Sequence, residues 1–122
     1  MKEQLISFET AKLAKEKGFN IPCLFGYGKK EELKTYNKAD DFNSYVGTYT
    51  QISAPTQSLL QKWLREAHDL YVYCIPNINV LGVWHYVVEF KNKASNEISQ
   101  HYDTYEEALE KGLQEALKLI KQ

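Results

Sequence analysis

Two cysteines and three histidines are the side chains in this sequence best suited to metal binding or nucleophilic catalysis: Cys23, Cys74, His68, His85 and His101. No pair among them has the C-x2-C or H-x3-H spacing that is typical of a zinc site. Cys74 also lies in an apolar run of strand-forming residues, where a thiol is usually unreactive. The sequence therefore predicts no metal site, no cysteine nucleophile and no bound cofactor.

The remaining candidate for catalysis is His68, which directly precedes Asp69. Such a pair could exchange protons with a substrate. A histidine near the C-terminal end of a helix is also explained by the helix dipole, without any chemistry. His85 and His101 fall on neighbouring predicted strands, where a cross-strand polar pair is expected. The sequence thus predicts a protein that is not an enzyme, and catalysis by His68 or Cys74 is the alternative.

The stretch 55–67 predicts an amphipathic helix in the middle of the chain. Pro55 suits its first turn, where the missing N–H has no cost. The apolar residues recur at helical spacing and form a single stripe. They are Leu59, Leu60, Trp63, Leu64 and Ala67.

A second helix is predicted over 104–121. Thr104 and Glu107 have the spacing of a capping box, in which each side chain accepts a hydrogen bond from the other residue's backbone N–H. An apolar stripe follows with alternating spacings of three and four, and Gly112 lies within it. A glycine there indicates a close approach to the sheet. The acidic residues Glu106 and Glu110 are expected on a solvated face with Glu107.

The N-terminal stretch 7–17 predicts a shorter helix with clear signals at both ends. Ser7 is a suitable N-cap residue. Gly18 suits the left-handed position after the helix, and Phe19 can then fold back against Ala14.

Three runs after the central helix have the composition of strands: 70–75, 80–90 and 97–102. The first two are separated by a turn at 76–79, and links this short favour an antiparallel meander. Earlier in the chain the expected elements are a hairpin formed by 21–27 and 33–36, a loop at 37–48 and a short strand at 48–52.

These elements predict a single α+β domain over residues 1–122. Its antiparallel sheet combines the three-stranded meander 70–102 with the short N-terminal strands, whose order the sequence leaves open. The helices 7–17, 55–67 and 104–121 pack with this sheet.

Strand alternation suggests a binding surface. It assigns Tyr71 and Tyr73 to one side of their strand and Trp84 and Tyr86 to one side of the next. We expect the four to share an aromatic face, with the helices on the opposite aliphatic face. Either the N-terminal 50 residues cover the aromatic face, or it is an open platform for a protein partner or for a second copy in a homodimer.

Charge argues against general binding of nucleic acid. The formal net charge is −1, whereas phosphate contacts require a surplus of lysine and arginine. The helix–strand–strand–strand–helix order resembles a double-stranded-RNA-binding domain, but Asp103, Glu106 and Glu107 would repel phosphate at the start of the last helix. The alternative is a nucleic-acid contact by lysines of the N-terminal part, namely Lys12, Lys15, Lys29, Lys30 and Lys34.

The overall composition is that of a soluble globular protein. Hydrophobic residues make up 43% of the chain, and no apolar run reaches the roughly 18 residues that a membrane span requires. The N-terminus lacks the apolar core of a signal peptide, and the two cysteines are far apart. We therefore expect a cytoplasmic protein with reduced thiols and no membrane contact.

Three stretches closely resemble a family of short uncharacterised proteins encoded on prophages and mobile elements of gut anaerobic bacteria. They are 54–66 (APTQSLLQKWLRE), 104–120 (TYEEALEKGLQEALKLI) and the opening 7–19 (SFETAKLAKEKGF). The resemblance implies a small accessory protein that works inside a bacterium for a phage, and it provides no site residues. Together with the predicted face, it favours a non-catalytic protein-interaction module.

Overall fold

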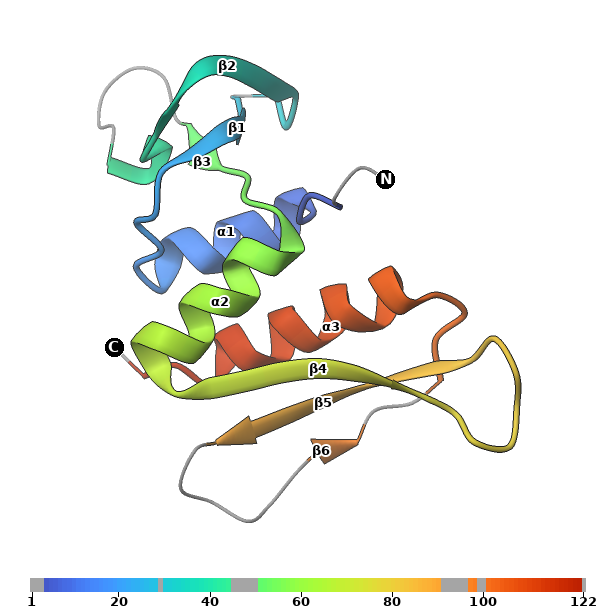
Figure 1. Ribbon diagram of the computed structural model, residues 1–122. Helices are drawn as coiled ribbons and strands as arrows, with labels where there is room; N and C mark the ends of the chain where they lie inside the picture. Colours follow the sequence, from blue (N-terminus) through green and yellow to red (C-terminus); the bar gives the residue numbers. More distant parts are fainter. Residues whose placement is uncertain (1–3, 29, 45–50, 91–96, 99–100, 122) are drawn as a thin grey trace.

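The computed structural model confirms an α+β fold with three helices and antiparallel sheets (Figure 1). It describes residues 4–28, 30–44, 51–90, 97–98 and 101–121. The helices are α1 (Phe8–Glu16), α2 (Gln57–His68) and α3 (Tyr105–Lys118), with a 3-10 turn, η1, at Phe42–Ser44. The strands are β1 (Cys23–Tyr27), β2 (Leu33–Asp40), β3 (Ile52–Ser53), β4 (Leu70–Pro76), β5 (Trp84–Phe90) and β6 (Glu97–Ile98).

The N-terminal strands form a sheet of their own, in the order β2-β1-β3, rather than extending the meander. The predicted hairpin is present, and its turn is closed by the Gly28 N–H, which donates to the Glu32 carbonyl at 2.8 Å. β2 continues to Asp40, through residues that we expected to be a loop. Nearly all of β2 is exposed on both faces, so its sequence carries no apolar alternation. Residues 45–50, part of the predicted loop and the next strand, lie outside the described residues.

The second sheet has the order β4-β5-β6 and is the predicted antiparallel meander. β5 begins at Trp84, four residues later than predicted. Gly82 has a positive φ of 79°, which ends the extended conformation before that strand. The residues expected to be the start of β5 therefore belong to the loop 77–83.

The core lies between the helices and one face of the second sheet (Figure 1). α3 packs along β4 and β5, α2 contacts β4 and α3, and α1 lies against α3. The predicted close approach at Gly112 is confirmed, since a Cβ there would lie 2.8 Å from the Tyr86 Cβ and 3.0 Å from the Val72 Cγ1. The large side chains that are fully buried include Ile6, Phe19, Leu60, Leu64, Leu70, Leu113 and Leu117.

Each helix begins after a threonine or serine cap. The Ser7 and Thr104 side chains accept from the backbone N–H groups of Thr10 and Glu107, as predicted. For α2 the cap is Thr56, so Pro55 precedes the helix instead of forming its first turn. The Pro55 carbonyl instead accepts a hydrogen bond from the Ile6 N–H at 3.1 Å.

The end of α1 also agrees with prediction. Gly18 has a φ of 91°, and the Phe19 N–H donates to the Ala14 carbonyl at 2.9 Å. This closing bond directs the chain back so that the Phe19 ring enters the core, where its edge meets Trp63.

Candidate interaction surfaces

Apolar side chains are exposed at the end of the β4–β5 hairpin, which projects beyond the helices (Figure 1). Ile78 is 95% exposed and Leu81 is 101% exposed, while Val80 is 48% exposed. We call these three residues the hairpin tip. Single exposed aliphatic residues are common on protein surfaces. Three within four consecutive residues, on a loop that contributes nothing to the core, form a distinct apolar feature.

The loop that carries the hairpin tip has a defined backbone. The Asn77 N–H donates to the Val83 carbonyl at 2.8 Å, which closes the loop. The Asn77 Oδ1 accepts from the Asn79 N–H at 2.8 Å and from the Val80 N–H at 3.1 Å. Such a side-chain turn fixes the chain much as a backbone turn would. The apolar side chains are therefore presented by an ordered loop.

Asn77 also ties the loop to the sheet. Its Nδ2 lies 3.0 Å from the Nε2 of His85. Because the Asn77 Oδ1 accepts from two backbone N–H groups, the amide nitrogen is the group that faces His85, and the Nε2 atom accepts. The His85 ring also meets His101 edge to face at 4.9 Å between centroids, so the structure brings these two histidines together.

The predicted aromatic face does not exist as one surface. The register pairs Cys74 with Tyr86 and Pro76 with Trp84, which places Tyr86 and Trp84 on the helix side of the sheet. There Tyr86 packs beneath Gly112, and the Trp84 ring meets Tyr105 at 5.3 Å.

The other two aromatic residues of that prediction, Tyr71 and Tyr73, lie on the opposite, outer face of the sheet. Alternation within each strand was correct, but it does not determine which sides of two strands coincide, because a shift of one residue reverses a whole strand. On the outer face the Tyr73 hydroxyl donates to the Glu89 carboxylate at 2.7 Å. This bond, with a smaller contribution from burial, raises the pKa of Tyr73.

A second apolar feature lies on the outward side of α2. Ile21, Leu59, Trp63 and Ala67 line a hollow of about 340 Å³, which we call the α2 hollow. Its rim carries Lys62 and Glu66, which pair with each other at 3.8 Å between Nζ and Oε1. Most of the predicted apolar stripe of this helix packs in or against the core, including Trp63 and Leu59. Leu60 and Leu64 are fully buried, whereas Leu59 is half-buried and Ala67 is exposed.

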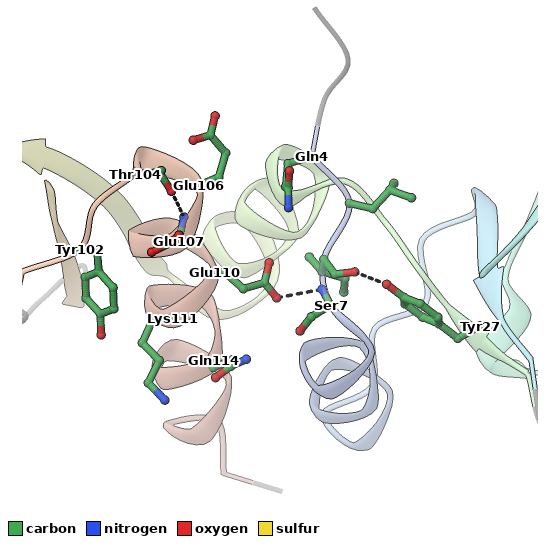
Figure 2. Close-up of a pocket in the computed structure, with 12 residues that line it drawn as sticks. Gln4, Ser7, Tyr27, Tyr102, Thr104, Glu106, Glu107, Glu110, Lys111 and Gln114 are labelled. Carbon is green, nitrogen blue, oxygen red and sulfur yellow. Dashed lines mark hydrogen bonds between the residues drawn. The ribbon is translucent and has the colours of Figure 1, made fainter. Parts of the chain in front are cut away.

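A larger cavity of about 750 Å³ lies between the N-terminal segment and α3 (Figure 2). Glu110 extends from α3 into this region and accepts from the Ser7 N–H at 2.9 Å, from the Thr10 hydroxyl and from the Gln57 amide at 3.0 Å. Glu110 therefore joins three parts of the chain, and our expectation of a solvated side chain is wrong. No spacing in the sequence distinguishes it from Glu106, which is exposed.

Tyr27 and Gln114 also line this cavity, and the Gln114 amide donates to the Thr10 hydroxyl at 2.9 Å. The Tyr27 hydroxyl donates to the Ile6 carbonyl at 2.7 Å. Burial, and then the negative charge of Glu110, raises the pKa of Tyr27. The polar groups of the cavity therefore bond to the surrounding chain segments, which is the arrangement of a structural junction.

The candidate catalytic residues are not brought together. Burial, with a smaller effect of Glu106, raises the pKa of Cys74 to about 12, so its thiol stays protonated. The His68 ring packs against Trp63 at 4.8 Å between centroids, at the end of α2. Asp69 follows in the left-handed conformation, with a φ of 54°. Within the described residues, no cluster of three or more histidine, cysteine or acidic side chains has the arrangement to hold a metal.

The lysines of the nucleic-acid alternative are divided between α1, which carries Lys12 and Lys15, and the β1–β2 hairpin, and Lys29 is outside the described residues. The Lys15 Nζ donates to the Gln51 carbonyl at 3.2 Å, and Lys34 lies 3.6 Å from the Glu32 carboxylate. Lys12 lies over the Phe8 ring. Lys30 is exposed at the β1–β2 turn. This alternative stays a prediction that no contact in the described part of the chain favours.

Comparison with protein-family models, with curated proteins and with solved structures finds no match. Across the described stretches, no helix combines the length and the apolar character needed to cross a bilayer. Of the surface features described above, the hairpin tip is the one whose apolar side chains are most exposed, whereas Ile21, Leu59 and Trp63 of the α2 hollow pack on or within the core.

Proposed function

We propose that this protein is a non-catalytic protein-interaction module and that the hairpin tip is its contact element. The observation that carries the proposal is the nearly complete exposure of Ile78 and Leu81 on an ordered, projecting loop. Burial of such side chains against a partner is favourable, because it removes apolar area from water. An ordered loop also loses little conformational freedom on binding.

The surroundings of the hairpin tip favour a protein partner over a lipid surface. No charged residue occurs from Pro76 to Trp84. At the base of the hairpin, Trp84 pairs with Tyr102, and the acidic residue Asp103 follows directly, with Glu106 in the first turn of α3. Acidic groups near the contact would repel an anionic membrane. They are compatible with an apolar pocket on a protein.

This proposal replaces the aromatic face. Trp84 and Tyr86 pack beneath α3 and are withdrawn as contact residues. Tyr71 and Tyr73 remain on the outer face of the sheet. The contact element is instead the loop 77–83, of which the sequence placed residues 80–83 in a strand.

We further propose that the protein acts in the cytoplasm of a bacterium as an accessory protein of phage or prophage type. The resemblance of residues 54–66 and 104–120 to such proteins supports this role. The state of the cysteines is compatible with a reducing compartment, since Cys23 and Cys74 are both free thiols.

Photo-crosslinking in the native host tests the proposed function. A photoreactive amino acid replaces Leu81 in one variant and the exposed Lys38 of β2 in a matched control. We expect a discrete protein adduct from the first position and none from the control. The proposal fails if the Leu81 position gives no adduct, or if both positions give the same mixture.

A further inference from the structure

We infer that His85 is a pH-sensitive switch that controls the order of the loop 77–83 and, through it, the presentation of the hairpin tip. Neutral His85 holds the loop in its ordered form, and protonated His85 releases it. The regulatory part of this inference rests on the proposed function, because it concerns the same contact element.

The Asn77 amide can meet the His85 ring in only one orientation. Its Oδ1 accepts from the Asn79 N–H at 2.8 Å and from the Val80 N–H at 3.1 Å. Because a backbone N–H can only donate, the amide oxygen must face these two groups and the Nδ2 group must face the ring. Nδ2 lies 3.0 Å from the His85 Nε2 atom. That atom therefore accepts, which it can do only without a proton, so the ordered loop requires a neutral His85.

Protonation of Nε2 disrupts this arrangement whichever way the amide responds. If the amide keeps its orientation, two N–H donors face each other across 3.0 Å and the loop loses its tie to the sheet. If the amide turns over, Oδ1 accepts from the charged ring, and Nδ2 then faces the Asn79 and Val80 N–H groups, so both bonds of the turn are lost. Hydrogen bonds from charged donors are stronger than neutral ones, which favours the second response. In either case the loop is less ordered when His85 is charged.

Two histidines meet at the base of this loop. Trp84 and Tyr102 exchange both backbone N–H···O bonds, at 2.8 and 2.9 Å, so positions 85 and 101 form the adjacent non-hydrogen-bonded pair, in which side chains lie closest. The His85 and His101 ring centroids are 4.9 Å apart. Histidine is the side chain that ordinarily changes charge between pH 5 and 8. Two charged rings at this distance would repel each other, so acidification weakens the base of the loop further.

Other titratable side chains of the described residues share the outer face of the sheet with His85. They are Tyr71, Tyr73, Glu89 and His101. Glu89 accepts from the Tyr73 hydroxyl and lies four residues along β5 from His85, roughly 13 Å at the rise of a strand, so its charge is largely screened. Asp103, beyond the Tyr102 bridge, is exposed to water. The groups in contact with the ring, Asn77 and His101, therefore affect its charge more strongly than Glu89 does.

A less ordered loop weakens the contact made by the hairpin tip. An ordered loop loses little conformational freedom when a partner binds, whereas a disordered loop must first be ordered. The direction of the pH effect follows from Nε2, which is an acceptor only in the form that dominates at higher pH. We therefore expect binding through Ile78 and Leu81 to be stronger at pH 7 than at pH 5.

NMR spectroscopy of the isolated protein tests the switch without any partner. The exchange rates of the Asn79 and Val80 amides are measured at pH 7 and pH 5, and each is divided by the rate of an unstructured peptide at the same pH. We expect the protection of both amides to fall at least about fivefold, the equivalent of one hydrogen bond. The Tyr73 and Val87 amides, within the β4–β5 pairing, should keep their protection. The nitrogen-15 signals of His85 should show an unprotonated Nε2 at pH 8 and a protonated one at pH 5.

His85→Gln is the matched variant, because its side-chain oxygen can accept from the Asn77 Nδ2 group at every pH. The protection of the loop amides should then be the same at pH 7 and pH 5. His101→Gln removes the neighbouring imidazole as a control and should keep the fall. Circular dichroism checks the fold of each variant. His85→Phe, which cannot gain a proton either, replaces the first variant if that one does not fold, and it should also show no pH dependence.

Three NMR results would overturn the inference: equal protection of the loop amides at both pH values in the wild type, the same fall in His85→Gln as in the wild type, or a proton on Nε2 at pH 8. Loss of protection throughout β4 and β5 at pH 5 would also overturn it, because the acid would then act on the whole sheet.

Photo-crosslinking from position 81 in host lysate at pH 7 and pH 5 tests the regulatory part. The adduct should decrease at pH 5 in the wild-type background and not in the His85→Gln background, which also controls for effects of pH on the partner. An adduct that is equally strong at both pH values would overturn the regulation and leave the proposed function intact. No adduct at either pH, with the loop transition present by NMR, would mean that the proposed function fails although His85 controls the loop.

Discussion

Gly112 is the residue where α3 meets the sheet without room for a side chain. We expect Gly112→Ala to lower the free energy of unfolding by about 1–3 kcal/mol, because the new methyl group would lie 2.8 Å from the Tyr86 Cβ. This cost exceeds the gain of roughly 1 kcal/mol that alanine usually gives in a helix. Urea unfolding measures the change, with the exposed neighbour substitution Lys111→Ala as control. A variant as stable as the wild type would contradict the close approach.

Cys74 is a residue whose chemistry is suppressed by its surroundings. Because its pKa is raised to about 12, its thiolate fraction at pH 8 is roughly a thousandth of that of an ordinary cysteine. We expect slow reaction of the folded protein with a thiol reagent, becoming faster as the pH rises, and rapid reaction after unfolding in urea. Because the pKa of the Cys74 thiol is higher in the folded than in the unfolded protein, its protonated form favours the folded state. This contribution to stability is lost as the pH rises from about 9 towards 12. Rapid labelling of Cys74 at pH 8 in the folded protein would contradict the raised pKa of its thiol.

Among the elements, the β4–β5 loop depends on one side chain for its order. Asn77→Ala removes the Oδ1 that accepts from the Asn79 and Val80 N–H groups, so we expect these amides to exchange with solvent at least about tenfold faster. Crosslinking to a partner through a photoreactive residue at position 81 should also weaken in the same variant. Hydrogen exchange by NMR gives the first result and photo-crosslinking the second. Asn79→Ala keeps both bonds and should change neither.

The N-terminal segment, α1 and α2 are joined to α3 through Glu110. We expect Glu110→Ala to lower the free energy of unfolding by about 2 kcal/mol, because the partly buried donors of Ser7, Thr10 and Gln57 lose their acceptor. Thermal unfolding measures the loss. Glu106→Ala, one helical turn away and exposed, is the control and should be nearly neutral. Equal effects of the two changes would show that Glu110 is an ordinary surface residue.

The helices were predictable because their signals are local. Ser7 and Thr104 cap the helices within three residues of their own position, and Gly18 ends α1 in the same way. The register of β4 on β5 is not local. It depends on how the seven residues between these strands fold, so the sequence assigned Trp84 and Tyr86 to the wrong face. The exposure of Leu81 could not be predicted from the sequence either, because an aliphatic residue next to a strand-forming run is normally assigned to that strand.

For the whole molecule, the core that the helices share with the second sheet predicts that α2 and β5 unfold together. Trp63 lies in α2 beside Phe19, and Trp84 lies at the start of β5. The Trp84→Phe variant leaves Trp63 to report on α2, and the Trp63→Phe variant leaves Trp84 to report on β5. We expect the fluorescence midpoint in urea to coincide with the midpoint from circular dichroism in each variant. Two separate midpoints in the same variant would indicate two independently folding units instead of the single domain predicted from the sequence.

The independence of the hairpin tip from the core has a consequence for how this sequence can change over time. Ile78 and Leu81 touch nothing that holds the fold together, so a folded chain gains no stability from keeping them apolar. Selection for folding alone would let both positions drift to polar residues, which also reduce aggregation. Lineages in which the tip stays apolar would then be those in which the contact itself is under selection, and loss of the partner would be followed by polar substitutions at these two positions first.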